Sequence, residues 1–174
     1  IQEMSENTLL PNELAFLALA NEYCAALESA REAERSEFTA HMLRLLPRIY
    51  IAAADLRQDD MPDTDAYVAN ALDEDYYDAV RMRVAELMGE DDTYLEVFEQ
   101  DMKYSDTPIG ASVAESLADL FQVFYNIVQT AREATPELIA ELIPEIRADF
   151  ADYWSRTLCN VLRALNKIHY NPSL

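Results

Sequence analysis

Glycine is almost absent from this chain, which has two glycines, Gly89 and Gly110, among its 174 residues. Antiparallel β proteins need glycine in hairpin turns and bulges, so a chain this poor in glycine rarely folds that way. Alanine, leucine and glutamate are abundant here, and all three are strong helix formers. The composition therefore predicts an all-α fold.

Apolar residues recur at helical spacing in several long segments, separated by proline or by polar residues. These segments cover residues 12–33, 36–56, 73–88, about 91–104, 108–133 and 136–168. Long amphipathic helices joined mostly by short links form antiparallel bundles. We therefore predict that residues 1–174 form a single domain, an antiparallel bundle of about six helices.

Three residues mark expected irregularities in these helices. Pro47 lies inside the second segment and Pro144 inside the last, and a proline within a helix removes a hydrogen bond and crowds the preceding turn. We therefore expect the second and last helices to be kinked, the last dividing into a short piece at 136–143 and a long one to about 168. Gly89 follows the third segment, where a residue with positive φ commonly ends a helix.

The chain is strongly acidic, with 33 aspartates and glutamates, 13 lysines and arginines, and a net charge of −20. Such a charge opposes binding to phosphate backbones and to anionic lipids. Residues 57–72 lack helical periodicity and are predicted to form an acidic loop. No apolar run approaches the roughly 20 residues that span a bilayer, and no apolar signal-peptide core is present. We expect a cytoplasmic protein with a protein partner, not a nucleic acid or a membrane, and leave a homo-oligomer open.

Motifs for the common kinds of catalysis are missing from the sequence. It contains no glycine-rich phosphate loop, no GxSxG elbow and no cysteine–histidine pattern for zinc. We therefore expect no cofactor, and interpret the chain as a non-enzymatic helical module for protein interaction. A nucleic-acid-mimicking decoy, which would present its carboxylates to a basic protein, is an alternative interpretation of the same acidity.

Two pairs of acids suggest a further alternative. Glu96 and Glu99 are three residues apart, and Glu115 and Asp119 on the next predicted helix are four apart. Mg²⁺-dependent all-α nucleotide pyrophosphatases look similar, with Glu-x-x-Glu on one helix and Glu-x-x-Asp on the next. The alternative hypothesis is thus a Mg²⁺-dependent phosphohydrolase that binds its metal through Glu96, Glu99, Glu115 and Asp119.

The last predicted helix carries a polar stripe in a chain that has few cations. Its members are spaced four, three and four residues apart: Arg156, Asn160, Arg163 and Lys167. Asp119 and Gln122 on the preceding helix are candidates to meet this stripe. Two interpretations remain open, a network of ion pairs and amides that sets the helix register, and a site for a small anion or a peptide carboxylate.

Three runs carry a resemblance to a known family: GEDDTYLEVFEQDMKYSDTP, SLADLFQVFYNIV and ADYWSRTLCNVLRALNKIHY. They resemble a family of small acidic all-helical proteins from Bacteroidetes that has only an unknown-function label. The resemblance implies an all-helical fold and a bacterial, cytoplasmic setting, but no activity. The candidate binding residues are Gln122 from the stripe argument and seven that match the family motifs: Asp101, Tyr104, Asp106, Asp119, Trp154, Asn160 and Arg163.

Overall fold

The computed structural model describes residues 9–59, 64–95 and 110–171. These residues form six α-helices, which confirms the predicted all-α class. The helices are α1 (Pro11–Glu28), α2 (Arg35–Ala54), α3 (Glu74–Met88), α4 (Val113–Glu133), α5 (Pro136–Asp149) and α6 (Ser155–Tyr170). Within this part of the chain, no helix is both long and apolar enough to cross a membrane.

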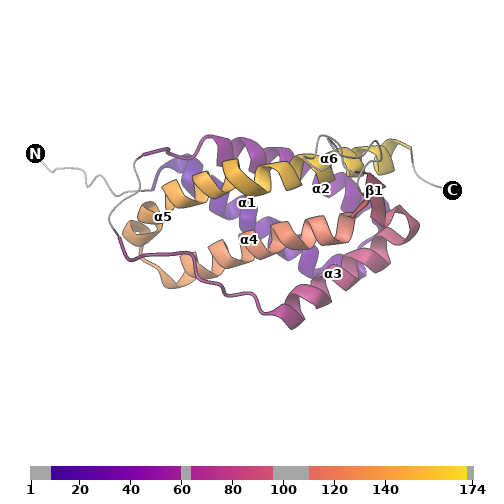
Figure 1. Cartoon of the computed structure of the whole chain (residues 1–174), viewed down its shortest axis with the longest axis horizontal. Coiled ribbons are helices and arrows are strands. Elements are labelled where there is room, and N and C mark those ends of the chain that lie inside the picture. The colour runs from indigo at the N-terminus through magenta and orange to yellow at the C-terminus, as the bar shows by residue number, and fades with distance from the viewer. Residues whose placement is uncertain (1–8, 60–63, 96–109, 172–174) are drawn as a thin grey trace, which may run out of the picture.

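Helix α4 lies at the centre of the bundle. It contacts α1, α3 and α6, while α2 packs against α1 and α6. Figure 1 shows α4 running along the long axis of the molecule between α6 and α3. One cluster of buried side chains joins all six helices and includes Phe16 of α1, Phe124 of α4 and Trp154, which precedes α6. The core is thus continuous through the bundle.

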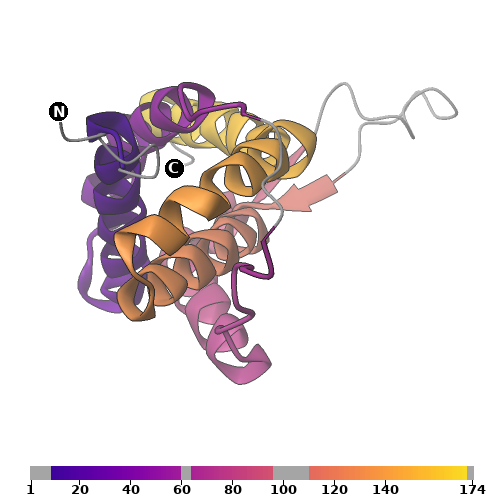
Figure 2. The same cartoon turned by 90° about the vertical axis from the view of Figure 1, so that its left-hand side faces the viewer.

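A short hairpin replaces the start of the helix predicted at about 91–104. Strand β1 (Thr93–Leu95) pairs antiparallel with β2 (Gly110–Ser112), at one edge of the bundle in Figure 2. Asp92 explains the difference, because its carboxylate accepts the Ala114 N–H at 2.7 Å and the Ser112 hydroxyl at 2.8 Å. It therefore caps α4 from outside instead of starting a helix of its own. The remainder of the predicted helix, 96–104, lies outside the described residues.

Both internal prolines lie within continuous helices. Helix α2 continues through Pro47, and α5 continues through Pro144 to Asp149, so the predicted break after residue 143 is wrong. Ile143 and Ile146 on either side of Pro144 are buried in the core, and this packing holds the helix together despite the missing hydrogen bond. The α-helical pattern changes later, at a π-helical turn, η4 (Phe150–Trp154), between α5 and α6.

Gly89 ends α3 with φ of +55°, as the sequence predicted. The guanidinium of Arg35 lies against it, donating to the Leu87 carbonyl at 2.8 Å and to Asp91 Oδ2 at 3.0 Å. A Cβ atom at Gly89 would lie 2.8 Å from Arg35 Nη2. The position therefore favours glycine both for its backbone conformation and for its space.

The described part of the predicted acidic loop, 57–59 and 64–72, contains neither helix nor strand. Side chains of α4 hold it in place: Thr130 Oγ1 accepts the Ala69 N–H at 2.9 Å, and Asn126 Oδ1 accepts the N–H groups of Ala71 and Leu72, each at 2.9 Å. This stretch of the loop consequently lies along α4.

An ion pair between a buried glutamate and a partly exposed arginine joins the start of this loop to α1. Glu13 is 1% exposed and accepts two hydrogen bonds from Arg57, at 2.7 Å from Nε and 2.8 Å from Nη2. Glu13 Oε1 also accepts the Leu10 N–H at 2.9 Å, which satisfies a backbone donor at the N-terminus of α1. The pair compensates for the burial of the carboxylate.

Candidate functional site: an acidic cleft beside α4

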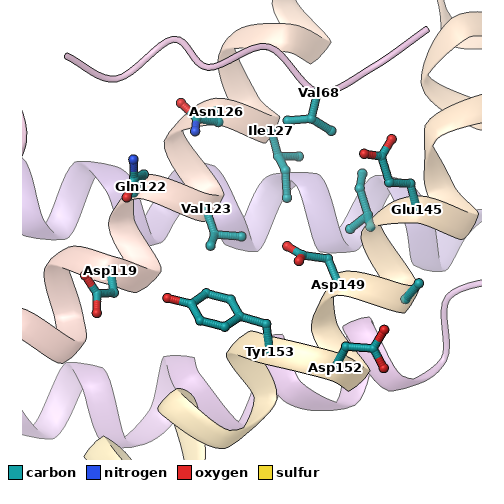
Figure 3. A pocket seen from close by; sticks show the side chains of 12 residues that line it. Val68, Asp119, Gln122, Val123, Asn126, Ile127, Glu145, Asp149, Asp152 and Tyr153 are labelled. Carbon is teal, nitrogen blue, oxygen red and sulfur yellow. The ribbon is translucent and has the colours of Figure 1, made fainter. Parts of the chain in front are cut away.

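A cleft of about 440 Å³ lies between α4, α5 and the π turn, with Val68 of the loop at its rim (Figure 3). Its polar lining consists of four carboxylates, two amides and one phenol: Asp119, Glu145, Asp149, Asp152, Gln122, Asn126 and Tyr153. Its apolar lining includes Val68, Val123, Ile127 and Ile146. The described residues that line the cleft include no lysine, arginine or histidine. We refer to it below as the acidic cleft.

Helical spacing brings these polar side chains together. On α4, Asp119, Gln122 and Asn126 follow one another at intervals of three and four residues, and so share one face. Glu145, Asp149 and Asp152 follow at intervals of four and three on the opposing wall. The cleft is therefore formed where two polar stripes face each other beside the buried core.

Asp119 is held by a neighbour from α3. The Tyr77 hydroxyl donates a hydrogen bond to Asp119 Oδ1 at 2.6 Å. Burial raises the pKa of Tyr77, and the hydrogen bond and charge of Asp119 raise it further. Tyr77 is therefore a neutral donor at physiological pH, and it fixes the Asp119 carboxylate at the wall of the cleft.

The acidic residues of the cleft also act on one another. Partial burial, followed by the charge of Asp152, raises the pKa of Asp149. Burial and the charges of Asp119 and Asp149 raise the pKa of Tyr153, while Arg156 lowers it. The part of these shifts that comes from neighbouring acids indicates a local negative potential, which disfavours further negative charge and favours a bound cation.

The π turn gives the side chains at its end opposite environments. Tyr153 lines the cleft, whereas the next residue, Trp154, is 1% exposed and lies in the core. The Trp154 ring packs against those of Phe16, Phe124 and Phe150, at centroid distances of 6.3, 5.0 and 4.7 Å. Its Nε1 is buried and has no hydrogen-bond partner among the described residues. The structure thus places Trp154 behind the cleft rather than in it.

The residues singled out in the sequence are divided between two places. Asp119 and Gln122 line the acidic cleft. Arg163 lies farther along α6, where its Nη2 donates to the Leu95 carbonyl of β1, and Asn160 is partly buried on the same helix. Asp101, Tyr104 and Asp106 lie outside the described residues, so their predicted role stays a prediction.

The proposed magnesium ligands are only partly described. Glu96 and Glu99 lie outside the described residues, Glu115 is exposed, and Asp119 faces the acidic cleft. Within the described ranges, no group of three or more histidine, cysteine, aspartate or glutamate side chains is arranged to hold a metal ion. The magnesium hypothesis stays a prediction for the four residues together.

Glu145, Asp149, Asp152 and Tyr153 are cleft residues that the sequence reasoning missed. The signal that could have found three of them is the spacing of four and three residues, which matches the stripe on α4. Such acidic stripes commonly form the solvated face of a helix. Here the stripe is the wall of a cleft and not a solvated face, because α4 and the loop around Val68 lie beside it. Helical spacing reveals the position of neither.

The fold and the acidic cleft define a small, acidic helical-bundle protein. The chain belongs to a family described as a domain of unknown function (DUF5063), whose model matches residues 9–171, and this confirms the resemblance to a family of unknown function. The crystal structure of protein BF1032 from Bacteroides fragilis is similar, with a TM-score of 0.80 and 27% identity over 94% of this chain and 95% of that one. None of the curated proteins compared with the chain matches it.

Proposed function

We propose that the protein is a bacterial, cytoplasmic, non-enzymatic interaction module that binds a cationic segment of a protein partner in its acidic cleft. One observation carries this proposal: four carboxylates line a concave, partly apolar cleft whose described lining has no cation. Concave sites with an apolar floor and a few oriented polar groups are the usual form of binding sites. The excess of acidic groups specifies a ligand of positive charge.

The chemistry of the lining favours recognition over catalysis. Catalysis by an activated hydroxyl, thiol or amine needs that group beside a base such as histidine, and the described lining contains no serine, threonine, cysteine, lysine or histidine. The Tyr77 hydroxyl holds the Asp119 carboxylate in a fixed position at the wall of the cleft. Fixed charges at the wall of a cleft orient a cationic partner and accelerate its association.

Irregular backbone beside the cleft supports the same proposal. Asp149 precedes the π turn, and Asp152 and Tyr153 lie within it. π-helical turns are rare and are frequently found at functional sites. At the end of this turn, the buried indole N–H of Trp154 has no hydrogen-bond partner among the described residues, which is uncommon for a buried polar group. Both features occur at the wall that carries most of the acids.

Chemical-shift mapping tests the proposal. A lysine-rich peptide is titrated into the ¹⁵N-labelled protein, and a peptide with norleucine in place of lysine serves as the uncharged control. The lysine peptide should shift the amide signals of the cleft segments, 119–127 and 145–153, and the Asp119→Asn/Asp149→Asn double variant should abolish these shifts. The norleucine peptide should produce none.

A variant of an acid outside the cleft provides the matched control. Glu137 is an exposed acid on α5 that does not line the cleft, so Glu137→Gln should leave the shifts unchanged. Shifts that spread evenly over the acidic surface and respond equally to Glu137→Gln would refute a specific role for the cleft.

A further inference from the structure

The four carboxylates of the acidic cleft are spread along it and do not meet at one point. Figure 3 shows Asp119 on one side, on α4, and Glu145 and Asp152 on the far side, with Asp149 between them. No described group of three or more acidic, histidine or cysteine side chains is arranged around a metal ion. A compact divalent cation therefore fits the cleft poorly, whereas a cation with separated charges fits it better.

Apolar side chains occupy the interval between the two ends. In Figure 3, Val123 lies between Asp119 and Asp149, and Ile127 lies above Asp149. Methylene groups gain free energy when they leave water for such a surface, whereas a second charge placed there would lose its hydration. The matching ligand carries a charge at each end and an alkyl chain in the middle.

The polar groups at the Asp119 end suit an ammonium group. An ammonium has three N–H donors and no acceptor, so it needs several oxygen acceptors around it. The Tyr153 phenol points toward Asp119 in Figure 3, and Gln122 on the next turn of α4 offers an amide oxygen. Asn126 is committed elsewhere, because its Oδ1 accepts the N–H groups of Ala71 and Leu72.

We infer that the acidic cleft recognises two ammonium groups joined by an alkyl spacer, one at Asp119 and the other at Asp149 and Asp152. The inference rests on the proposed function and narrows it to one ligand chemistry. Two sources supply this chemistry, a free linear diamine or polyamine and a pair of lysine side chains on a partner protein. The cleft itself does not distinguish them, so the experiment has an arm for each.

Calorimetry with amines of matched length tests the pairing of charges. Diaminobutane and butylamine differ in one ammonium group, and diaminopropane and diaminohexane vary the spacer. The wild-type protein should bind its best diamine about tenfold more tightly than the monoamine of equal length, because the second ion pair adds about 1.4 kcal/mol. Asp119→Asn should remove this advantage, so that the variant binds the diamine and the monoamine of equal length with similar affinity.

Asp152→Asn is the second variant, since Asp152 is exposed and its substitution leaves the core intact. This substitution should also reduce the preference for the diamine over the monoamine, because it removes a carboxylate from the second ammonium site. Glu137→Gln should not change that preference. In the second arm, a peptide with two lysines is compared with one in which norleucine replaces one lysine. An advantage seen only with the peptides assigns the ligand to a partner protein. An advantage seen only with free amines assigns it to a diamine or polyamine and overturns the protein partner of the proposed function.

The outcomes separate this inference from the function on which it rests. Equal affinity for diamine and monoamine, together with equal affinity for the two peptides, would overturn the pairing of charges. If Asp149→Asn still weakened that binding, the proposed role of the acidic cleft in binding a cation would stand. If no amine or lysine peptide bound to the cleft, both the inference and the proposed function would be wrong.

Discussion

The Tyr77 hydroxyl donates to Asp119 Oδ1 at 2.6 Å and so links α3 to the wall of the acidic cleft on α4. Helix α4, which carries Asp119, also packs against α6. Three helices therefore contribute to the position of this carboxylate. Neither residue alone indicates this role, because tyrosine and aspartate are common on helix surfaces. The contact fixes the position of the Asp119 carboxylate at the wall of the cleft.

Tyr77→Phe removes the donor and leaves the ring. The free energy of unfolding should fall by about 1 kcal/mol, the usual net contribution of one such hydrogen bond. Binding of a lysine peptide should weaken as well, because Asp119 is no longer held in place. Urea unfolding and calorimetry measure the two effects, and Tyr67→Phe is the control, since Tyr67 is an exposed tyrosine of the loop. Equal effects of the two substitutions would contradict this role for Tyr77.

Much of the architecture could be predicted from the sequence. The scarcity of glycine and the apolar periodicity predicted an all-α fold, and the position of Gly89 predicted where α3 ends. Such features are local, because each depends on residues within one or two turns. Local rules were sufficient for these elements.

The hairpin and the continuous α5 could not be predicted in this way, because both depend on distant contacts. The β1–β2 pairing joins residues 93–95 to 110–112, and the Asp92 carboxylate accepts a hydrogen bond from the first turn of α4. Pro144 is tolerated because the neighbouring isoleucines are buried against the rest of the bundle. The sequence indicated two residues of the acidic cleft, Asp119 and Gln122. The residues of the opposing wall could not be predicted, because their position depends on how α5 packs beside α4.

The ion pair between the buried Glu13 carboxylate and Arg57 predicts a large effect on stability. Arg57→Ala leaves the carboxylate of Glu13 buried without its counter-charge, and the free energy of unfolding should fall by about 3–5 kcal/mol. Arg48→Ala, at an exposed position on α2, should change it by less than about 0.5 kcal/mol. Chemical denaturation of both variants provides the comparison. A loss at Arg57 no larger than that at Arg48 would show that Glu13 does not depend on the pair.

Gly89→Ala should destabilise the protein by about 1–3 kcal/mol, because alanine must adopt the positive φ found at this position. The new Cβ would also displace the Arg35 guanidinium and weaken its contacts with Leu87 and Asp91. Gly110→Ala is the control, since a Cβ atom there meets no described atom within 4 Å and the backbone φ is not positive. Thermal unfolding should show a clear drop for the first variant and little change for the second.

Asp149 predicts a specific dependence of stability on pH. Burial and Asp152 raise its pKa in the folded state above the unfolded value, so between the two values the folded protein binds more protons than the unfolded chain. The contribution of Asp149 to the free energy of unfolding therefore decreases as pH rises through this window. Glu145, Asp152 and Tyr153 also line the cleft around it, and Arg156 lies one turn beyond Asp152.

Asp149→Asn removes the free-energy cost of holding a charged carboxylate at this position. The variant should be more stable than the wild type at neutral pH, and the difference should shrink as pH falls through the folded pKa of Asp149. Thermal unfolding across a pH series measures the difference, with Asp65→Asn in the exposed part of the loop as the control. A difference that is independent of pH would show that the Asp149 charge is not its cause.

The central claim is that the acidic cleft binds a cationic ligand through its carboxylates. The most direct measurement is calorimetry of a lysine-rich peptide at increasing salt, with the wild type and with Asp119→Asn/Asp149→Asn. The wild type should bind the peptide, its affinity should fall steadily with salt, and the double variant should lose most of the affinity at low salt. Equal affinity for both proteins, or an affinity unaffected by salt, would contradict the claim.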